Sequence, residues 1–289
     1  MIIPTKKLKS GFEMPVYGLG TWQMGGREVR NPENDDEADI QAIKSAIDLG
    51  ITHIDTAESY ADGYTETLIG RAIKDYDRSK LFIVSKVKEI NLHYDDVINS
   101  AQASLKRLGI NYLDLYLIHM PSLTIPIDET MKAMDFLKSE GLIKNIGVSN
   151  FNVEEFEKAQ SFTKNKIVAN QLHLNLKYRE AERRGLLDYC QKNDVMFIAW
   201  RPLQKGVLLL EKENILDEMA KKYHKTPSQI AINWLISQEN VVTLSKTRNV
   251  EHLKDNLGAL DFGMEKYDIE RLTRDFPDQQ DVSDAVTLH

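Results

Sequence analysis

Residues 81–119 have the sequence LFIVSKVKEINLHYDDVINSAQASLKRLGINYLDLYLIH, and this stretch decides the fold class. It begins with one apolar, β-branched run, Leu81–Val87, and it ends with another, Leu113–His119. Between them, Tyr94–Gly109 has apolar residues at helical spacing and stops at a glycine. Continuous apolar runs are typical of strands that are buried on both faces of a parallel sheet. The stretch therefore predicts a strand–helix–strand unit.

The same alternation extends over the rest of the chain. Further apolar runs are Val16–Trp22, Ile51–Thr56, Ile143–Ser149, Ile167–Leu172, Val195–Leu203 and Val241–Lys246. Further helical patterns are Asp35–Gly50, Glu66–Lys74, Asp128–Leu137, Val153–Gln160, Glu180–Asn193, Asn214–Tyr223, Thr226–Ser237, Val250–Leu260 and Lys266–Arg274. Strands that alternate with helices predict an α/β protein, and a closed (β/α)8 TIM barrel is the simplest solution. A doubly wound sheet is the alternative, but Gly18-Leu19-Gly20-Thr21-Trp22 lacks the third glycine of a dinucleotide-binding turn.

Both ends of the chain add to this barrel. Ile2–Leu8 and Phe12–Val16 flank Lys9-Ser10-Gly11, which predicts an N-terminal hairpin that plugs one end of the barrel. The last helical patterns predict extra C-terminal helices. The sequence contains no Pro/Gly/Ser-rich linker, so we expect residues 1–289 to form a single (β/α)8 barrel domain.

Composition narrows the class of function. The net charge of −7, from 37 Lys and Arg against 44 Asp and Glu, argues against general binding to nucleic acids or acidic membranes. No apolar run approaches the ~18 residues of a membrane span, and the first residues do not resemble a secretory signal. The single Cys190 excludes an internal disulfide, and we expect it to be packed in a helix. These features predict a cytoplasmic protein; the oligomeric state stays open, with a monomer favoured.

Polar side chains stand where the predicted strands end, which is where a barrel of this kind carries its chemistry. Asp55, Lys86 and His119 each end a run, and Tyr60 follows Asp55 in a loop. Each of them alone has an ordinary explanation, such as a turn cap or a packed core side chain. The combination of an acid, a base, an imidazole and a phenol at matching positions is much harder to explain in that way.

The four residues together could carry out proton transfer to a carbonyl group. A free tyrosine has a pKa of about 10, so it needs help to exchange a proton near neutrality. An ammonium group ~4 Å away contributes roughly 4 kcal/mol at an effective dielectric constant of 20, and we expect Lys86 to lower the phenol pKa of Tyr60. A carboxylate such as Asp55 would keep a buried lysine charged, and His119 would orient a carbonyl group beside the phenol.

These residues and their surroundings resemble the aldo-keto reductase family. The matching segments are Gly18–Trp22, Gly50–Tyr60, Ser85-Lys86, Leu115–Pro121, Ile146–Phe151, Asn170-Gln171, Ala199–Leu203 and Leu244–Asn256. They span nearly the whole chain in the family's order. The resemblance implies a (β/α)8 barrel that binds NADPH and passes a hydride to an aldehyde or ketone. It also implies that Tyr60 is the general acid, that Lys86 and Asp55 tune it, and that His119 positions the substrate.

The resemblance further assigns binding residues. The implied cofactor contacts are Gly20, Thr21, Trp22, Asp55, Ser149, Asn150, Gln171, Trp200, Arg201, Leu203, Lys246, Thr247, Arg248, His252, Asp255 and Asn256. The implied substrate pocket consists of Trp22, Met24, Tyr60, Lys88, His119 and Met120. Among these, Lys246 and Arg248 supply the cations that a 2′-phosphate needs, and Trp200 takes the place of the aromatic ring that stacks on the nicotinamide.

The sequence departs from the family pattern at several of these positions. Arg201 replaces a common serine, Met120 replaces a common tryptophan, and Lys88 stands where some members have an aromatic wall. These changes predict small or polar carbonyl substrates. His252 replaces an arginine that several members place on the 2′-phosphate, which predicts NADPH preference with some use of NADH.

Other classes of function account for the sequence less well. A weakly catalytic or regulatory nicotinamide-cofactor-binding barrel is the main alternative, although all four catalytic-type residues are present. A phosphate-sugar isomerase or lyase would leave those four residues unexplained. The seven histidines contain no H-x-x-x-H pair and no H-E-x-x-H motif, so the sequence predicts no metal site.

Overall fold

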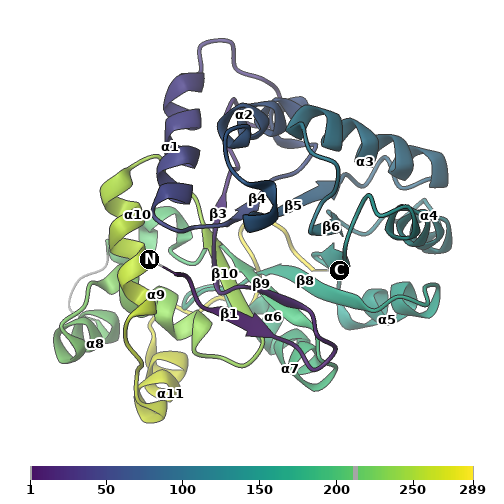
Figure 1. The fold of residues 1–289 in the computed structure, drawn as a ribbon. Coiled ribbons are helices and arrows are strands. Elements are labelled where there is room, and N and C mark those ends of the chain that lie inside the picture. The colour runs from purple at the N-terminus through teal and green to yellow at the C-terminus, as the bar shows by residue number, and fades with distance from the viewer. Residues whose placement is uncertain (1, 211–213, 289) are drawn as a thin grey trace.

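Eight parallel strands close into a barrel in the computed structural model, which describes residues 2–210 and 214–288 (Figure 1). Their order around the barrel is β10-β3-β4-β5-β6-β7-β8-β9. The strands are β3 (Tyr17–Gly20), β4 (His53–Asp55), β5 (Phe82–Val87), β6 (Leu115–Ile118), β7 (Ile146–Ser149), β8 (Ile167–His173), β9 (Met196–Trp200) and β10 (Val241–Ser245). Each lies within, or within one residue of, a predicted apolar run, and nearly all of their residues are buried. The prediction of a closed (β/α)8 barrel is confirmed.

Helices surround the barrel (Figure 1). They are α1 (Asp36–Asp48), α2 (Tyr64–Ile73), α3 (Tyr94–Leu108), α4 (Ile127–Ser139), α5 (Val153–Ser161), α6 (Glu180–Arg183), α7 (Leu186–Lys192), α8 (Ile215–Tyr223), α9 (Pro227–Ile236), α10 (Val250–Leu257) and α11 (Lys266–Asp275). The prediction of one helix over Glu180–Asn193 is wrong, because Gly185 has a φ of 76° and separates α6 from α7. Within α7, Cys190 is fully buried, as predicted, and burial raises the pKa of its thiol to about 12.

The N-terminal hairpin closes one end of the barrel, as predicted. Strands β1 (Thr5–Lys7) and β2 (Glu13–Pro15) pair in antiparallel orientation. Leu8, Phe12 and Met14, in and around the hairpin, are buried in a cluster with apolar residues of the barrel strands, among them Val84 and Leu115. Because the hairpin fills that end, the opposite end, where the strands finish, is the one available for a site.

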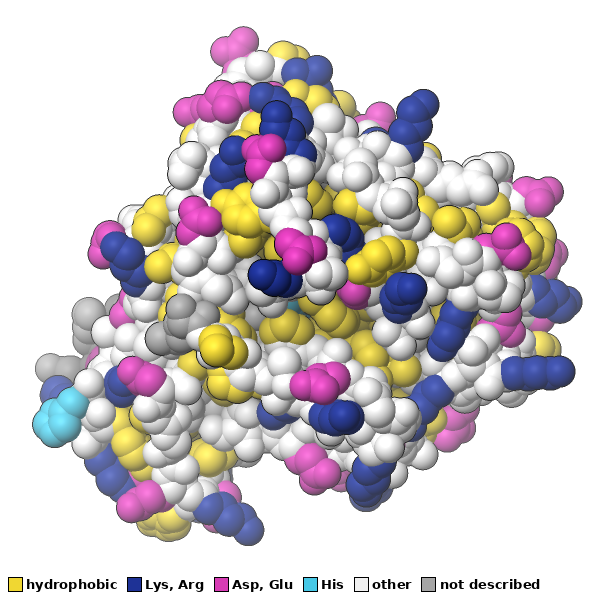
Figure 2. All heavy atoms as spheres, viewed as in Figure 1, with side chains coloured by type: hydrophobic (Ala, Val, Ile, Leu, Met, Phe, Trp, Pro, Cys, Tyr) yellow, Lys and Arg dark blue, Asp and Glu magenta, His cyan; other side chains and the backbone are white. Residues whose placement is uncertain are grey.

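The outer surface carries both signs of charge. Figure 2 shows acidic and basic side chains interspersed over one face of the molecule. None of the helices in residues 2–210 and 214–288 has the length and the apolar composition that crossing a membrane requires.

Candidate active site

Three of the predicted catalytic residues form one hydrogen-bonded group at the carboxyl ends of neighbouring strands. Asp55 ends β4, Lys86 lies near the end of β5, and Tyr60 begins the short 3-10 helix η1 (Tyr60–Gly63). The Lys86 Nζ atom donates to Asp55 Oδ1 at 2.6 Å, to the Thr56 carbonyl oxygen at 2.8 Å and to the Tyr60 hydroxyl at 3.3 Å. Since the ammonium donates to the phenolic oxygen, the phenolic proton is left for another acceptor.

The backbone that carries Tyr60 is held in an unusual conformation. Ala61 and Asp62 have φ values of 51° and 54°, in the left-handed region that residues with a Cβ rarely adopt. Their N–H groups donate to the carbonyl oxygens of Arg27 and Glu28 in the loop after β3. The neighbouring loop therefore maintains the turn that points Tyr60 toward Lys86, which is typical of strained turns at functional sites.

The surroundings of Lys86 favour its charged form. Its side chain is completely buried, and burial by itself favours the neutral amine. The Asp55 charge and the hydrogen bonds with Asp55 and Tyr60 outweigh that effect, so the pKa of Lys86 is raised above its ordinary value. The direction of this shift agrees with the expectation that Asp55 keeps the buried lysine charged.

Lys86 acts on the phenol pKa of Tyr60 in the expected direction, but burial of the hydroxyl outweighs its effect. Burial raises the pKa of the Tyr60 hydroxyl, Lys86 lowers it and Asp55 raises it, and the net result is a pKa above the ordinary value of 10. The charge of Asp55 cancels part of the effect of Lys86, so desolvation prevails. Tyr60 is consequently protonated at neutral pH, which is the state from which an acid donates.

His119 completes the group as a neutral imidazole. It directly follows β6, and its ring lies 5.8 Å from the Tyr60 ring, edge to face. Burial and then the charge of Lys86 lower its pKa to about 3. The Ser59 hydroxyl lies 3.2 Å from Nδ1. With Ser59 as donor to Nδ1, the ring carries its proton on Nε2 and is able to donate a hydrogen bond to a substrate oxygen.

Two predicted cofactor residues instead support Asp55. Gln171 donates from Nε2 to Asp55 Oδ2 at 2.7 Å, and only 4% of Gln171 is exposed. Thr21 is fully buried, and its hydroxyl donates to the Asp55 carbonyl oxygen at 2.8 Å. The Thr21 hydroxyl is thus engaged with Asp55, and the predicted cofactor contact of Thr21 stays a prediction. Gln171 holds the carboxylate that accepts from Lys86, and Thr21 holds the backbone of the same residue.

Ser149 and Asn150 lie beside this group at the end of β7. The Ser149 hydroxyl donates to the Gln171 carbonyl oxygen at 3.0 Å. The Asn150 amide donates to the His119 carbonyl oxygen at 3.1 Å and to the Ser149 hydroxyl at 3.0 Å. This network brings an amide and a hydroxyl, as predicted, to the same end of the barrel as the catalytic group.

Trp200 at the end of β9 is supported from behind by a second ring. The His173 ring lies parallel to it at 4.3 Å, with an interplanar angle of 10°. The Arg201 guanidinium carbon lies 5.2 Å from the Trp200 ring, and Nη1 pairs with Asp284 at 3.4 Å. Asp284, near the C-terminus, thus partly neutralises the charge of Arg201 beside the Trp200 ring. Leu203, predicted as a further contact, is partly buried against the core.

The predicted 2′-phosphate residues follow β10. Lys246 is exposed, and Thr247 accepts the Asn249 N–H at 3.0 Å. Arg248 donates from Nε to Asp39 at 2.5 Å and from Nη2 to Asn34 at 2.9 Å. The two cations therefore differ, because Arg248 is anchored by protein groups and Lys246 extends into solvent.

The remaining predicted residues of this region lie on α10. His252 is exposed. Asp255 accepts hydrogen bonds from Thr226 and Gln229 at the start of α9. Asn256 is buried, and its amide donates to Tyr17 and Ser245. The structure thus gives Asp255 and Asn256 a role in fixing α10 against its neighbours.

The residues of the predicted substrate wall differ in exposure. Trp22 is partly exposed, and its ring lies 4.9 Å from the Tyr60 ring. Lys88 and Met120 are also partly exposed at this end of the barrel. Met24 is wrong as a pocket residue, because it is fully buried in the core between the barrel and its helices. Its apolar side chain belongs to the packing, and it offers no surface to a substrate.

Sequence reasoning missed several supporting residues. Asp39 on α1, Ser59 next to Tyr60, and His173 behind Trp200 all hold predicted site residues in place. The position of His173, two residues beyond Gln171 on the same strand, was a usable signal, since alternate residues share a strand face. Asp39 lies within a helical pattern and carries no local signal of its role.

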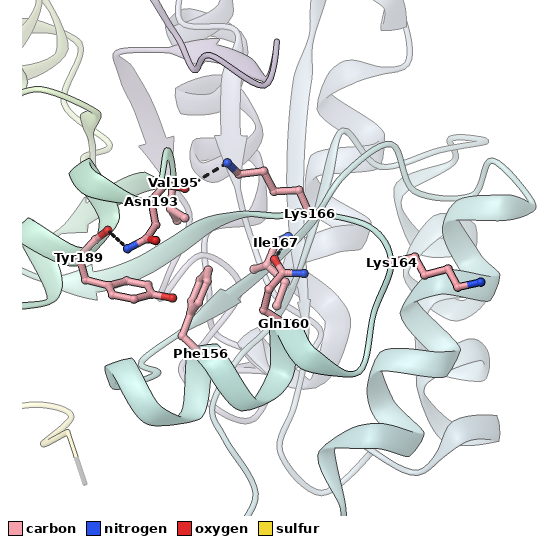
Figure 3. A pocket seen from close by; sticks show the side chains of 8 residues that line it. All are labelled: Phe156, Gln160, Lys164, Lys166, Ile167, Tyr189, Asn193 and Val195. Atoms are coloured by element: carbon pink, nitrogen blue, oxygen red, sulfur yellow. Dashed lines mark hydrogen bonds between the residues drawn. The ribbon is translucent and has the colours of Figure 1, made fainter.

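A hollow of about 320 Å³ lies elsewhere on the molecule. Its lining includes Ile167, Asn193 and Val195 (Figure 3). These residues lie at the amino-terminal ends of β8 and β9, whereas the catalytic group lies at the carboxyl ends of the strands. Lys166 at its edge donates to the Asn193 carbonyl oxygen and pairs with Asp194. The hollow is therefore separate from the chemistry. Within residues 2–210 and 214–288, no group of three or more His, Cys, Asp or Glu side chains is arranged to hold a metal ion.

The donor set at the strand ends fits a nicotinamide dinucleotide. A partly exposed aromatic ring, Trp200, is suited to stacking, and Ser149 with Asn150 matches the polar groups of a carboxamide. Lys246 and Arg248 lie where an anionic phosphate would be stabilised, next to the N-terminus of α10. Aromatic, amide and cationic groups thus occur in the combination that such a cofactor requires.

Comparisons with known proteins agree with this geometry. The family model described as "Aldo/keto reductase family" matches residues 17–274. Methylglyoxal reductase of Escherichia coli is 32% identical over 268 residues, which cover 91% of this chain and 92% of the relative. Glyoxal reductase of Bacillus subtilis is 34% identical over 270 residues, with coverage of 93% and 91%.

Solved structures extend the comparison to the fold. A thermostable aldo-keto reductase in complex with the inhibitor epalrestat is 43% identical, with a TM-score of 0.90 over 94% of this chain and 99% of that chain. An aldo/keto reductase of Klebsiella pneumoniae, in complex with NADP and acetate, is 29% identical, with a TM-score of 0.85 over the full length of both chains.

Proposed function

Because the chain belongs to the aldo/keto reductase family and is an oxidoreductase of that family, we propose that it reduces aldehydes or ketones to alcohols with NADPH, with Tyr60 as general acid. The observation that carries this proposal is the buried Lys86 ammonium, which donates to both Asp55 and the Tyr60 hydroxyl. A neutral phenol with a fixed cation on its oxygen is prepared to release a proton when the acceptor gains negative charge.

The reaction needs one hydride and one proton for each carbonyl group. The hydride would come from a nicotinamide held at the strand ends, and it would be added to the carbonyl carbon. Tyr60 donates its proton to the carbonyl oxygen, and Lys86 stabilises the phenolate that remains until solvent returns a proton. His119, neutral because its pKa is about 3, donates a hydrogen bond from Nε2 to the same oxygen and so orients the carbonyl. Asp55 holds Lys86 in its charged form throughout.

The cofactor contacts follow from the residues around this group. Trp200 would stack on the nicotinamide, and Ser149 and Asn150 would hold its carboxamide. Lys246 and Arg248 would bind the 2′-phosphate that distinguishes NADPH from NADH. His252, exposed on α10, stands where several family members have an arginine, so the 2′-phosphate loses one guanidinium partner and NADH remains usable as a poorer cofactor.

The substrate is a small or polar carbonyl compound, such as a short aldehyde or a dicarbonyl. Lys88 and Met120 make the wall beside Tyr60 less aromatic, and the relatives named methylglyoxal reductase and glyoxal reductase are consistent with this class. An NADPH-oxidation screen over short aldehydes, dicarbonyls, sugars and steroid ketones tests it. A kcat/KM for steroid ketones far above that for every small carbonyl would refute this substrate class.

The experiment that tests the reaction is Tyr60→Phe, which removes the acidic hydroxyl and leaves the ring. Reduction should fall by about 10² to 10⁴, the usual contribution of general acid catalysis, while the Kd for NADPH stays near the parent value. Tyr64→Phe is the matched control, because that hydroxyl bonds Asp36 away from the catalytic group and its loss should not affect turnover. Near-normal turnover of Tyr60→Phe, with chemistry rate-limiting, would exclude Tyr60 as the acid.

A further inference from the structure

One completely buried carboxylate lies outside the catalytic group and accepts an unusual number of hydrogen bonds. Asp39 on α1 accepts from the Gly25 N–H at 2.9 Å and from the Asn34 amide at 2.8 Å, both at Oδ2. Arg248, 209 residues away in sequence, donates to both of its oxygens, from Nε at 2.5 Å and from Nη2 at 3.0 Å. A bidentate ion pair of this kind fixes the plane of the guanidinium group.

The pair with Asp39 uses the Nε and Nη2 atoms of Arg248 and does not use Nη1. Nη2 also donates to Asn34 Oδ1 at 2.9 Å, whereas Nη1 makes no hydrogen bond with any residue that the structure describes. The Arg248 side chain is 39% exposed, and Asp39 beneath it is not exposed at all. The guanidinium is therefore anchored through Nε and Nη2, which leaves Nη1 available to a ligand at the loop that also carries Lys246.

The sign of the Asp39 charge makes this arrangement informative. A carboxylate close to an anion-binding loop repels the anion, so through its charge alone Asp39 weakens binding of a phosphate. A flexible arginine must lose side-chain freedom when it binds a ligand, and an arginine that is already fixed avoids this loss. Asp39 thus weakens anion binding through its charge and strengthens it by fixing Arg248. Replacing Asp39 shows which of the two effects is larger.

We propose that Asp39 is a positioning residue for cofactor selection: it holds Arg248 so that the free Nη1 edge meets the 2′-phosphate of NADPH. This inference rests on the proposed function. It assigns to α1 a part in distinguishing NADPH from NADH, although Asp39 itself touches no cofactor. It also explains why a carboxylate is tolerated beside this loop.

A double-mutant cycle with Asp39→Asn and Arg248→Met tests the inference. The Kd values of NADPH and NADH are measured by quenching of tryptophan fluorescence, without turnover. Asp39→Asn should weaken NADPH binding by roughly ten- to a hundredfold, the range for a hydrogen bond to a charged group, and leave NADH within about twofold. In the Arg248→Met background, Asp39→Asn should have no further effect on NADPH.

Glu37→Gln is the matched control. It removes the same charge from the same helix, where Glu37 also pairs with an arginine, Arg71, but is exposed. It should leave both Kd values unchanged. If Asp39→Asn does not fold, the variant Arg248→Lys takes its place. Lysine keeps the positive charge but cannot form the bidentate pair with Asp39. The Arg248→Lys variant should lose NADPH affinity to a similar extent.

Several results would overturn the inference. These are unchanged or tighter NADPH binding in Asp39→Asn, equal weakening of both cofactors, an effect that persists without Arg248, or full NADPH affinity in Arg248→Lys. The proposed function fails in a different way: the parent protein would then bind NADPH no more tightly than NADH, or neither of them.

Discussion

The substitution Lys86→Met separates the structural and the chemical roles of the buried ion pair. Lys86 and Asp55 are both buried, with 2.6 Å between Nζ and Oδ1. Methionine fills a similar volume but removes the charge. The Asp55 carboxylate then keeps the Gln171 amide, at 2.7 Å, as its hydrogen-bond donor among the described side chains. A buried charge without its counter-charge should destabilise the folded state.

The size of the effect follows from that distance. Two unit charges 2.6 Å apart attract by roughly 6 kcal/mol at an effective dielectric constant of about 20. Part of this is offset because Lys86 no longer has to be desolvated, and breaking a buried pair typically costs about 3–5 kcal/mol. For a chain of 289 residues, that loss corresponds to a fall in Tm of about 5–8 °C.

The test measures stability and turnover in Lys86→Met and in the double variant Lys86→Met/Asp55→Asn. Urea unfolding and thermal unfolding report the stability, and NADPH oxidation reports turnover. Lys86→Met should lose both stability and about 10² or more in reduction rate, because the phenolate formed on Tyr60 loses its cation. Adding Asp55→Asn removes the uncompensated charge, so the double variant should recover much of the stability and none of the turnover.

The reasoning would be refuted by either of two results. If Lys86→Met is as stable as the parent, the ion pair of Lys86 with Asp55 does not contribute to the stability of the folded state. If the double variant recovers turnover together with stability, Lys86 acts through the fold and not on Tyr60.

Three further predictions concern other parts of the molecule. The Lys246→Ala/Arg248→Ala double variant should lose the preference for NADPH, by about 10² to 10⁴ in kcat/KM, while NADH kinetics stay roughly constant; equal loss with both cofactors would assign these cations to the fold or to the shared pyrophosphate. Burial lowers the pKa values of His53 and His173 to about 4, so below about pH 6.5 the unfolded chain binds protons that the folded chain does not. Stability measured by urea unfolding should therefore fall as the pH falls from about 6.5 toward 4, by up to ~1.4 kcal/mol per pH unit for each histidine, and His173→Gln should reduce the slope; an unchanged slope would contradict this. Gly18→Ala should destabilise by about 1–3 kcal/mol, because its Cβ would lie 2.3 Å from Nδ1 of the fully buried His53, whereas Gly263→Ala, with no atom within 4 Å of the new Cβ, should be nearly neutral in Tm.

The amino-acid sequence alone determined the barrel and the position of its chemistry. A run such as Leu81–Val87 is apolar on both alternating faces, and that pattern is favourable only in a strand covered on both sides. Tyr94–Gly109, with its helical spacing, supplies the covering layer. Because parallel strands all finish at the same end, placing Asp55, Lys86 and His119 at the ends of three runs was enough to bring them together.

Tertiary structure decided what depends on partners distant in the chain and on burial. No local pattern relates Asp39 to Arg248, yet their contact anchors the cation of the 2′-phosphate loop. Met24 stands beside a predicted pocket in the sequence, but the packing of the helices encloses it completely. The direction of the Tyr60 pKa shift also required the fold, because the charge of Lys86 and the loss of water act in opposite directions. Desolvation depends on how completely the surrounding chain excludes water, and only the assembled barrel determines that.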